Sequence, residues 1–358
     1  LSSADLNADG VADFIVSQHP EKQVSDYSSV EVWLSNGGLS WHQITVAEAS
    51  RNPVSGEVAG YYHGHAVGDV DHNSSTDIVV ANGSNTGSFL LKNDGLGQFE
   101  KTALFTQQCV DDASCPASVM IAELEDINKD GLLDLLGQAA PSGLPYLYYG
   151  TPEGLFGIAG TRPLVDPGWE PRFQQFSQAG LGDWHTIEIA VFDADSDEDM
   201  DIVIEMTNYP AWEFVVLKNN GTLQDGTIQW EDISESFNSY HVSQGLYEDG
   251  VPDDNGNMSF SGNWFSTIGA FDINSDGRMD ILPHDTFGSY PEINFWTTDW
   301  VLLGTNEPFR YEYVRTKDIA TTDALIRVDT EQGGTVFLVS LSRPDVTLVN
   351  GTRVQNSD

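Results

Sequence analysis

The chain has 358 residues, of which 40% are hydrophobic and 34 are glycine, so it is long enough to bury a core and rich in turns. It carries 55 acidic residues against 15 lysines and arginines, a formal net charge of -40. Nucleic acids and anionic membrane surfaces bind basic proteins, so this charge excludes both as partners. No apolar run reaches about 18 residues, and we therefore expect no membrane insertion.

An acidic loop opens the chain. Carboxylate or amide oxygens stand at its first, third, fifth and ninth positions, and Gly10 occupies the sixth, where the chain bends most sharply. The side chains at the oxygen-bearing positions are Asp5, Asn7, Asp9 and Asp13. Oxygens at this spacing suit a hard cation that takes six to eight oxygen ligands, which is Ca²⁺. Strand-forming residues follow at 14–16, where an EF-hand would have a helix.

The same loop recurs four more times. Ser74 replaces the glycine in the second loop, where we expect weaker binding or a different bend, and Glu198 replaces it in the fourth. The oxygen-bearing residues are Asp69, Asp71, Asn73 and Asp77; Asp126, Asn128, Asp130 and Asp134; Asp193, Asp195, Asp197, Asp199 and Asp201; and Asp272, Asn274, Asp276 and Asp280. Asp and Asn are ordinary turn residues, but five copies at near-regular spacing are not a chance arrangement.

The spacing of the loops predicts the fold. They begin about 57 to 79 residues apart, and each repeat has one strand-like segment before its loop and about three after it. In the first repeat, residues 30–34 and 41–46 alternate around an Asn-Gly turn, which predicts a hairpin. No segment shows a helical period with caps. Four-stranded sheets that stack on copies of themselves indicate an all-β fold, a β-propeller with six blades favoured and seven as the alternative.

We expect residues 1–358 to form a single β-propeller domain. The blades that carry the loops cover about 1–300, and a degenerate closing blade covers about 301–358. Only four residues precede Asp5, too few for the first strand of that blade. We therefore expect the C-terminal segment near 346–349 to complete the first blade and close the ring.

The loops and their surroundings resemble the FG-GAP/VCBS repeat of integrin α-subunits and many secreted bacterial proteins. The residues that carry the resemblance, over about 1–300, are the acidic loop, the apolar triplet after it and the later pattern at Lys92–Phe99. The resemblance implies a propeller with up to five structural Ca²⁺ ions bound by the loop side chains. It also implies ligand carbonyls at the seventh loop positions, which are Val11, Ser75, Leu132, Asp199 and Arg278.

The two cysteines, Cys109 and Cys115, lie six residues apart. No second cysteine pair or histidine-rich partner stands at zinc spacing, so a local disulfide is the better interpretation. A disulfide indicates an oxidising compartment, and we expect a secreted, extracellular or cell-surface protein.

Histidines precede two of the loops. Period-two alternation predicts that Tyr61, His63 and His65 point to one side of a strand that lines the central channel, with His185 at the register of Tyr61. Such residues could bind a sugar, bind a transition metal or act as acid and base, so His63, His65 and His185 are the candidate catalytic residues. They could equally be packing residues where the blades crowd together.

Three functions remain open from the sequence. The leading hypothesis is a binding or adhesion module for a glycan or an extracellular protein. The alternative is a carbohydrate-active enzyme, similar to a polysaccharide lyase, that uses the channel histidines. The third is a scaffold domain of a larger chain or assembly. The Gly-x-Ser-x-Gly, phosphate-loop and His-Glu-x-x-His signatures are absent, which weighs against the common hydrolases and nucleotide enzymes.

Overall fold

The structure is a computed structural model. The residues that it describes are 2–18, 27–37, 40–50, 60–83, 87–112, 115–139, 144–157, 185–208, 211–223, 227–237, 251–252, 258–259, 265–272, 278–285, 300–305, 307–315, 326–329, 335–338, 346–349 and 352–355. Among them, no helix combines the length and the apolar character needed to cross a membrane.

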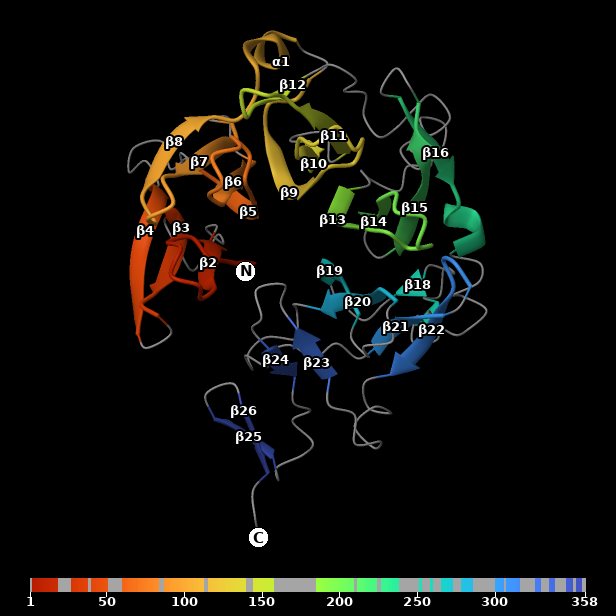
Figure 1. Ribbon diagram of the computed structural model, residues 1–358. Coiled ribbons are helices and arrows are strands. Elements are labelled where there is room, and N and C mark those ends of the chain that lie inside the picture. The colour runs from red at the N-terminus through yellow and green to blue at the C-terminus, as the bar shows by residue number, and fades with distance from the viewer. Residues whose placement is uncertain are drawn as a thin grey trace. The chain divides into compact units, whose positions relative to one another are not determined.

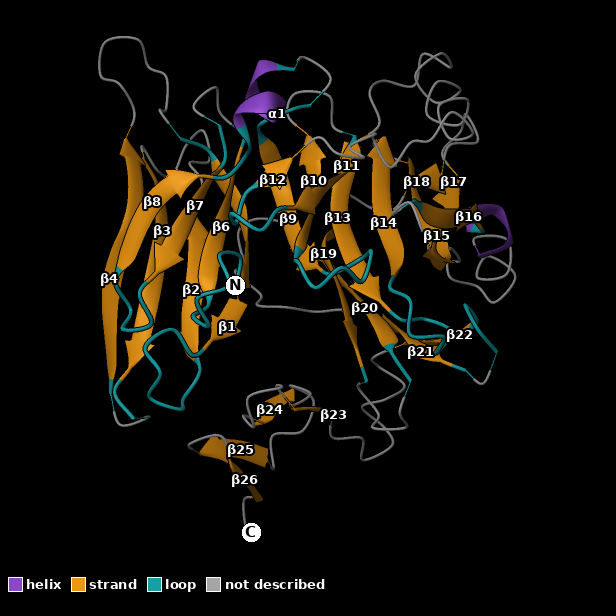
Figure 2. Cartoon of the chain, turned by 45° about the horizontal axis from the view of Figure 1, so that its top comes forward, coloured by secondary structure: helices purple, strands orange, loops and turns teal. Residues whose placement is uncertain are grey.

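The described chain is built from four-stranded sheets in which the strands follow one another in sequence order (Figures 1 and 2). Every strand pair with a defined register is antiparallel. Sheet 1 contains β1 (Ser2–Ala4), β2 (Asp13–Gln18), β3 (Tyr27–Ser35) and β4 (Trp41–Ser50). Sheet 2 contains β5 (Tyr62–Gly68), β6 (Asp77–Asn82), β7 (Phe89–Asn93) and β8 (Phe99–Ala103). Sheet 3 contains β9 (Val119–Glu125), β10 (Asp134–Ala139), β11 (Pro145–Gly150) and β12 (Phe156–Gly157).

Two further four-stranded sheets follow. Sheet 4 contains β13 (His185–Phe192), β14 (Asp201–Asn208), β15 (Ala211–Thr222) and β16 (Ile228–Asp232), and sheet 5 contains β19 (Phe265–Phe271), β20 (Asp280–Asp285), β21 (Trp300–Gly304) and β22 (Tyr311–Arg315). Three two-stranded pairs complete the list, β17 (Val251–Pro252) with β18 (Met258–Ser259), β23 (Ile326–Asp329) with β24 (Thr335–Leu338), and β25 (Val346–Val349) with β26 (Thr352–Gln355). The predicted all-β fold of four-stranded sheets is therefore confirmed.

The chain divides into two compact units. The first comprises residues 1–186 and 222–228, and the second comprises 187–221 and 229–358. Sheets 1 to 3 lie in the first unit, and sheet 5 with most of sheet 4 lies in the second. The single domain and the closed ring expected from the sequence remain predictions.

Both faces of the inner sheets are buried, which explains their unbroken apolar runs. In sheet 2, Ile78 and Val80 pack against Ile15 and Val32 of sheet 1. Val79 points the other way, into a second cluster with Leu135 and Tyr148 of sheet 3. In the second unit, Val203 and Val216 of sheet 4 pack in the same manner with Ile281 and Tyr311 of sheet 5.

The cysteines close a short insertion between sheets 2 and 3. Cys109 lies in α1 (Gln107–Asp111), whose N-cap, Thr106, accepts a hydrogen bond from the Cys109 amide. Cys109 and Cys115 form a disulfide with their Cα atoms 5.2 Å apart. Both side chains are buried in the cluster between the two sheets.

One expectation about the first sheet is wrong. Residues 2–4 do supply its first strand, because β1 pairs with β2 from Ser2 opposite Ile15 to Ala4 opposite Asp13. Three residues are enough because the acidic loop reverses the chain, so that β1 and β2 pair directly as antiparallel neighbours. The C-terminal segment 346–349 is not needed at that position and pairs instead with β26.

Candidate functional site: the acidic loops

Each acidic loop joins the first strand of a four-stranded sheet to the second. The loops are named loop 1 (residues 5–13), loop 2 (69–77), loop 3 (126–134), loop 4 (193–201) and loop 5 (272–280). Loops 1 to 4 are fully described. Asn274 and Asp276 of loop 5 lie outside the described residues, so the prediction that they bind a metal ion concerns the sequence only.

Loops 1 to 4 share one backbone conformation. The fourth and sixth residues both have positive φ, and the sixth residues are Gly10 (80°), Ser74 (68°), Gly131 (87°) and Glu198 (69°). The expectation of a different bend at Ser74 is therefore wrong. The reason is the first aspartate of each loop, whose two carboxylate oxygens accept the amides of the fifth and sixth residues at 2.9–3.2 Å. These hydrogen bonds hold the bend whichever residue occupies it.

The ninth residue is an anchor in every loop. Asp13, Asp77, Asp134, Asp201 and Asp280 are all fully buried. In loop 2, the Val70 amide donates to one oxygen of Asp77 at 3.0 Å, and the Asn93 amide of β7 donates to the other at 2.8 Å. The corresponding pairs of hydrogen bonds occur in loops 1, 3 and 4. The ninth aspartate thus ties its loop to the third strand of the sheet, a role that the sequence reasoning missed.

The anchor carboxylates are buried, and burial disfavours their ionised form. Burial raises the pKa of Asp77 to about 6 and the pKa of Asp134 and Asp201 to about 7, although backbone hydrogen bonds act in the opposite direction. The other loop carboxylates add like charge to each anchor. A cation bound to the loop would favour the ionised forms.

The third position separates the loops into two kinds. In loops 1 and 3 it is an asparagine, and the side-chain oxygens of Asn7 and Asn128 accept the amide two residues on. In loops 2 and 4 it is an aspartate, and Oδ1 of Asp71 and of Asp195 is buried without a hydrogen-bond partner. A buried carboxylate oxygen without a partner is costly, and a metal ion would satisfy it.

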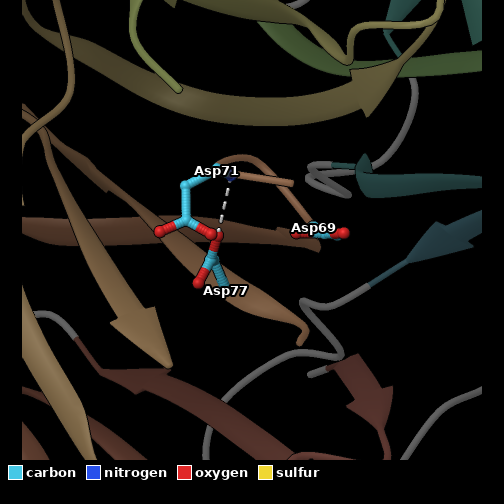
Figure 3. A group of neighbouring side chains, drawn as sticks. All are labelled: Asp69, Asp71 and Asp77. Atoms are coloured by element: carbon cyan, nitrogen blue, oxygen red, sulfur yellow. Dashed lines mark hydrogen bonds between the residues drawn. The ribbon is translucent and has the colours of Figure 1, made fainter. Parts of the chain in front are cut away.

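Among the described residues, two groups of carboxylates could hold a metal ion. They are Asp69, Asp71 and Asp77 in loop 2 (Figure 3) and Asp193, Asp195 and Asp197 in loop 4, and within each group the ligand oxygens lie within 4.8 Å of one another. Both groups contain one of the partnerless oxygens. The donor atoms are all oxygen, which fits a hard divalent cation.

Loop 1 satisfies its oxygens from within the protein. The Ser35 hydroxyl and the Gly37 amide donate to Asp9 at 2.6 and 2.8 Å, and these hydrogen bonds lower the pKa of its carboxyl group. The metal ligands predicted there, Asp5, Asn7, Asp9 and Asp13, come together in one loop as expected. Their role as ligands stays a prediction, as does that of the backbone carbonyls at the seventh positions.

A turn of the next sheet covers loop 2. The turn between β11 and β12 places Gly154 so close that a Cβ there would lie 2.8 Å from Cα of Asp71 and 3.0 Å from the Val70 oxygen. Gly97, in the matching turn of sheet 2, lies against Leu34 and Asn7 of sheet 1. In the first unit, therefore, the shape of an acidic loop affects how the next sheet packs.

The predicted cluster of channel histidines is wrong in its geometry. A β-bulge interrupts the pairing of β5 with β6 at His63, between Tyr62 and Gly64. An extra residue reverses the side on which the following residues point. Tyr61 and His63 stack with ring centroids 5.8 Å apart, whereas His65 bonds to Ser17 of sheet 1, with Nδ1 2.5 Å from the hydroxyl oxygen.

The environment of His65 is that of a packing residue. Burial lowers its pKa to about 3, so the ring is neutral at physiological pH, and its Nε2 is buried without a partner. His63 is exposed. The side chain of His185 lies outside the described residues. The described histidines therefore do not converge on one site.

Comparison with known proteins gives no family. No family model and no curated protein matches the chain. Among solved structures, a lectin of Agrocybe aegerita, in a study of its recognition of non-reducing terminal N-acetylglucosamine, is 16% identical with a TM-score of 0.41 and covers 85% of this chain. An exo-β-1,3-galactanase from Clostridium thermocellum is 10% identical with a TM-score of 0.37 and covers 92%. The chain spans 65% and 61% of those two structures, and likenesses this low bear on neither fold nor function.

Proposed function

We propose that the protein is a calcium-stabilised β-propeller of the FG-GAP/VCBS type that acts as a binding module. The observation that carries the calcium proposal is the pair of buried, partnerless oxygens of Asp71 and Asp195, each inside a group of three converging carboxylates. A set of oxygen-only ligands suits Ca²⁺ better than Zn²⁺, which prefers nitrogen and sulfur, or Mg²⁺, which demands a stricter geometry.

The calcium ions have a structural role in this proposal. Each loop links two strands of one sheet, and its anchor binds the third strand as well. A bound ion offsets the mutual repulsion of the loop carboxylates at a tight bend, so ion binding and folding are coupled. Loops 1, 3 and 5 would bind through the same positions, to a total of up to five ions.

We further propose that the sheets are blades of one closed ring, and the first sheet supports this. Phe14, Trp33 and Trp41 are 40%, 37% and 42% exposed, and the rings of Phe14 and Trp41 lie 4.9 Å apart. The residues that follow the ninth loop position in the other sheets, as Phe14 does in the first, are Ile78, Leu135, Ile202 and Ile281, and all of them are fully buried. An aromatic face at positions buried elsewhere indicates a face that another blade covers.

The covering blade in this proposal comes from the C-terminal region, in which β23 to β26 form two hairpins. Replacing Trp41 with alanine tests the closure. A covered Trp41 should cost about 3 kcal/mol of unfolding free energy on truncation, whereas an uncovered one, which keeps only its contact with Phe14, should cost about 1 kcal/mol. Leu96, an exposed loop residue, provides the control.

The proposed setting is extracellular, and the proposed ligand is a glycan or an extracellular protein. The Cys109–Cys115 disulfide supports an oxidising compartment, and the charge of -40 supports a partner that is not a polyanion. The described histidines do not form a catalytic group, so we propose binding rather than catalysis.

An array of immobilised glycans and extracellular matrix proteins, probed in Ca²⁺ and in EGTA, tests the binding function. We expect saturable binding to one class that disappears in EGTA with loss of the fold. Turnover of an acidic polysaccharide that persists in the folded protein would contradict a pure binding role. His63→Ala would then show whether the exposed histidine takes part.

A further inference from the structure

Two lysines approach the acidic loops that contain a third-position aspartate. Lys92 lies on β7 and Lys218 on β15, each one residue before the asparagine whose amide binds the ninth aspartate. The lysine Nζ atoms pair with Oδ2 of Asp71, at 3.2 Å, and with Oδ2 of Asp195. Lys218 also lies 3.5 Å from Asp197.

Each lysine uses only one oxygen of its partner. The other oxygen, Oδ1 of Asp71 or of Asp195, is the buried one without a hydrogen-bond partner. The side chain of Asp195 is only 6% exposed, so its free oxygen is enclosed within the loop. The third-position carboxylate therefore has one oxygen held by an ammonium group and one left for a second cation.

The repeats of the chain show the same association in their sequence. Where the third position is an aspartate, in loops 2 and 4, the third strand carries Lys92 or Lys218. Where it is an asparagine, in loops 1, 3 and 5, the matching strand residue is Leu34, Tyr149 or Leu303. The acid and the base occur together, and the amide occurs with an uncharged residue. The lysine thus accompanies the extra charge.

We propose that Lys92 and Lys218 are tethered counter-ions, each a lysine that neutralises the third carboxylate of its loop and competes with the bound metal ion. This inference rests on the proposed function, because it concerns how the same loops bind calcium. It divides the loops into two classes, in which loops 2 and 4 keep their shape without calcium and release it more readily. In loops 1, 3 and 5 the matching position on the third strand holds no lysine.

Electrostatics sets the direction of the effect. An ammonium group and a divalent ion on the two oxygens of one carboxylate repel each other at a separation of a few ångström. Even with the dielectric constant of water, this repulsion weakens ion binding about fivefold or more. The orientation that the lysine gives the carboxylate acts in the other direction, but one surface ion pair contributes less than this repulsion.

Calcium titration of the full chain by calorimetry tests the proposal. The Lys92→Met and Lys218→Met variants should each move one site to an affinity at least fivefold higher than in the wild type. Lys101→Met is the matched control, because Lys101 lies on the same sheet with its Nζ 3.6 Å from the centroid of the Phe89 ring, away from the loops. This control should leave every site unchanged.

A second readout separates competition from simple structural damage. In EGTA the same variants should melt at a lower temperature than the wild type, because the third carboxylate loses its counter-ion. In saturating calcium the decrease in melting temperature should be smaller or absent. The double variant Asp71→Asn with Lys92→Leu reproduces the Asn7 and Leu34 pair of loop 1 and should restore the melting temperature in EGTA. Damage to the fold would lower it under both conditions.

The outcomes distinguish the two proposals. A wild-type protein that binds no calcium would overturn both. A wild-type protein that binds calcium, with lysine variants that bind it equally or more weakly, would overturn only the tethered counter-ion. Tighter binding together with a lower melting temperature in EGTA is the result expected.

Discussion

Loops 1 and 2 have the same backbone but satisfy their oxygens differently. Both hold the bend with the first aspartate and anchor to the third strand with the ninth. In loop 1 the side-chain oxygens of the third and fifth residues accept hydrogen bonds from amides and from Ser35, so groups of the protein itself satisfy them. In loop 2 one oxygen of Asp71 has no partner and the other has Lys92.

The comparison shows that the shape of the loop and its need for a cation have different origins. The bend is formed by carboxylate–amide hydrogen bonds that loops 1 to 4 share. Among loops 1 to 4, a buried carboxylate oxygen without a hydrogen-bond partner occurs only at the third position of loops 2 and 4. A loop of this type therefore adopts the same bend with an aspartate or an asparagine at its third position.

The largest effect that tests this separation is on pH dependence. The buried anchors have raised pKa values in the folded state, about 6 for Asp77 and about 7 for Asp134. A group with a raised folded pKa stabilises the fold below its unfolded pKa and loses that contribution as pH rises through the folded value. In EGTA the unfolding free energy should thus fall by several kcal/mol between about pH 4 and pH 7.

Calcium should reverse this trend. The half-buried Glu123 and the buried Glu205, with pKa values raised to about 7 and about 8, contribute to the EGTA curve from outside the loops. The test is therefore the difference between urea titrations with and without calcium, measured at several pH values. Stabilisation by calcium should grow as pH rises, because protons and calcium compete for the same carboxylates. A difference that is independent of pH would contradict the account.

The anchor gives the next largest effect. Asp77→Ala would leave the amides of Val70, Asp71 and Asn93 without their acceptor and should cost about 3 kcal/mol of unfolding free energy. Asp13→Ala in loop 1 should cost a similar amount, since the anchor is common to both loops. Urea denaturation near pH 6 measures both. Asp94→Ala, in an exposed turn, is the control, and an equally small loss at Asp77 would show that the anchor is not structural.

Close packing over loop 2 predicts a smaller effect. Gly154→Ala would place a methyl group 2.8 Å from Cα of Asp71 at a φ of +70°, and it should cost about 2 kcal/mol and weaken calcium binding at loop 2. Gly131→Ala meets no atom within 4 Å and should cost only about 1 kcal/mol, from its positive φ. Equal decreases in the melting temperatures of the two variants would mean that the turn between β11 and β12 does not pack tightly against loop 2.

The smallest effect concerns the sixth position. Ser74 and Glu198 adopt the positive φ that Gly10 and Gly131 adopt without strain. Ser74→Gly and Glu198→Gly should therefore each stabilise the protein by up to about 1 kcal/mol, and Gly10→Ser should destabilise it by the same amount. Chemical denaturation in EGTA measures all three. Destabilisation by Ser74→Gly would mean that the serine side chain itself supports the loop.

Much of this could be predicted from the sequence, because the loops and the apolar runs after them are local signals. Asp5 to Asp13 and its repeats predicted the loops, and period-two runs such as 30–34 predicted the strands. The bulge at His63 could not be predicted, because it depends on how β5 pairs with β6. The bend at Ser74 could not be predicted either, because the carboxylate of Asp69 holds it whatever residue occupies the sixth position. The lysine–aspartate association can be read from the repeats, but the partnerless oxygens that give it an electrostatic role are known only from the structure.

The central claim is that the acidic loops bind calcium to stabilise the fold. A metal count by native mass spectrometry, with thermal melts of the same sample in calcium and in EGTA, tests it most directly. We expect three to five calcium ions per chain, a requirement that follows from the repeated loops, and a large fall in melting temperature in EGTA. A protein that carries no calcium and melts at the same temperature in both conditions would contradict the claim.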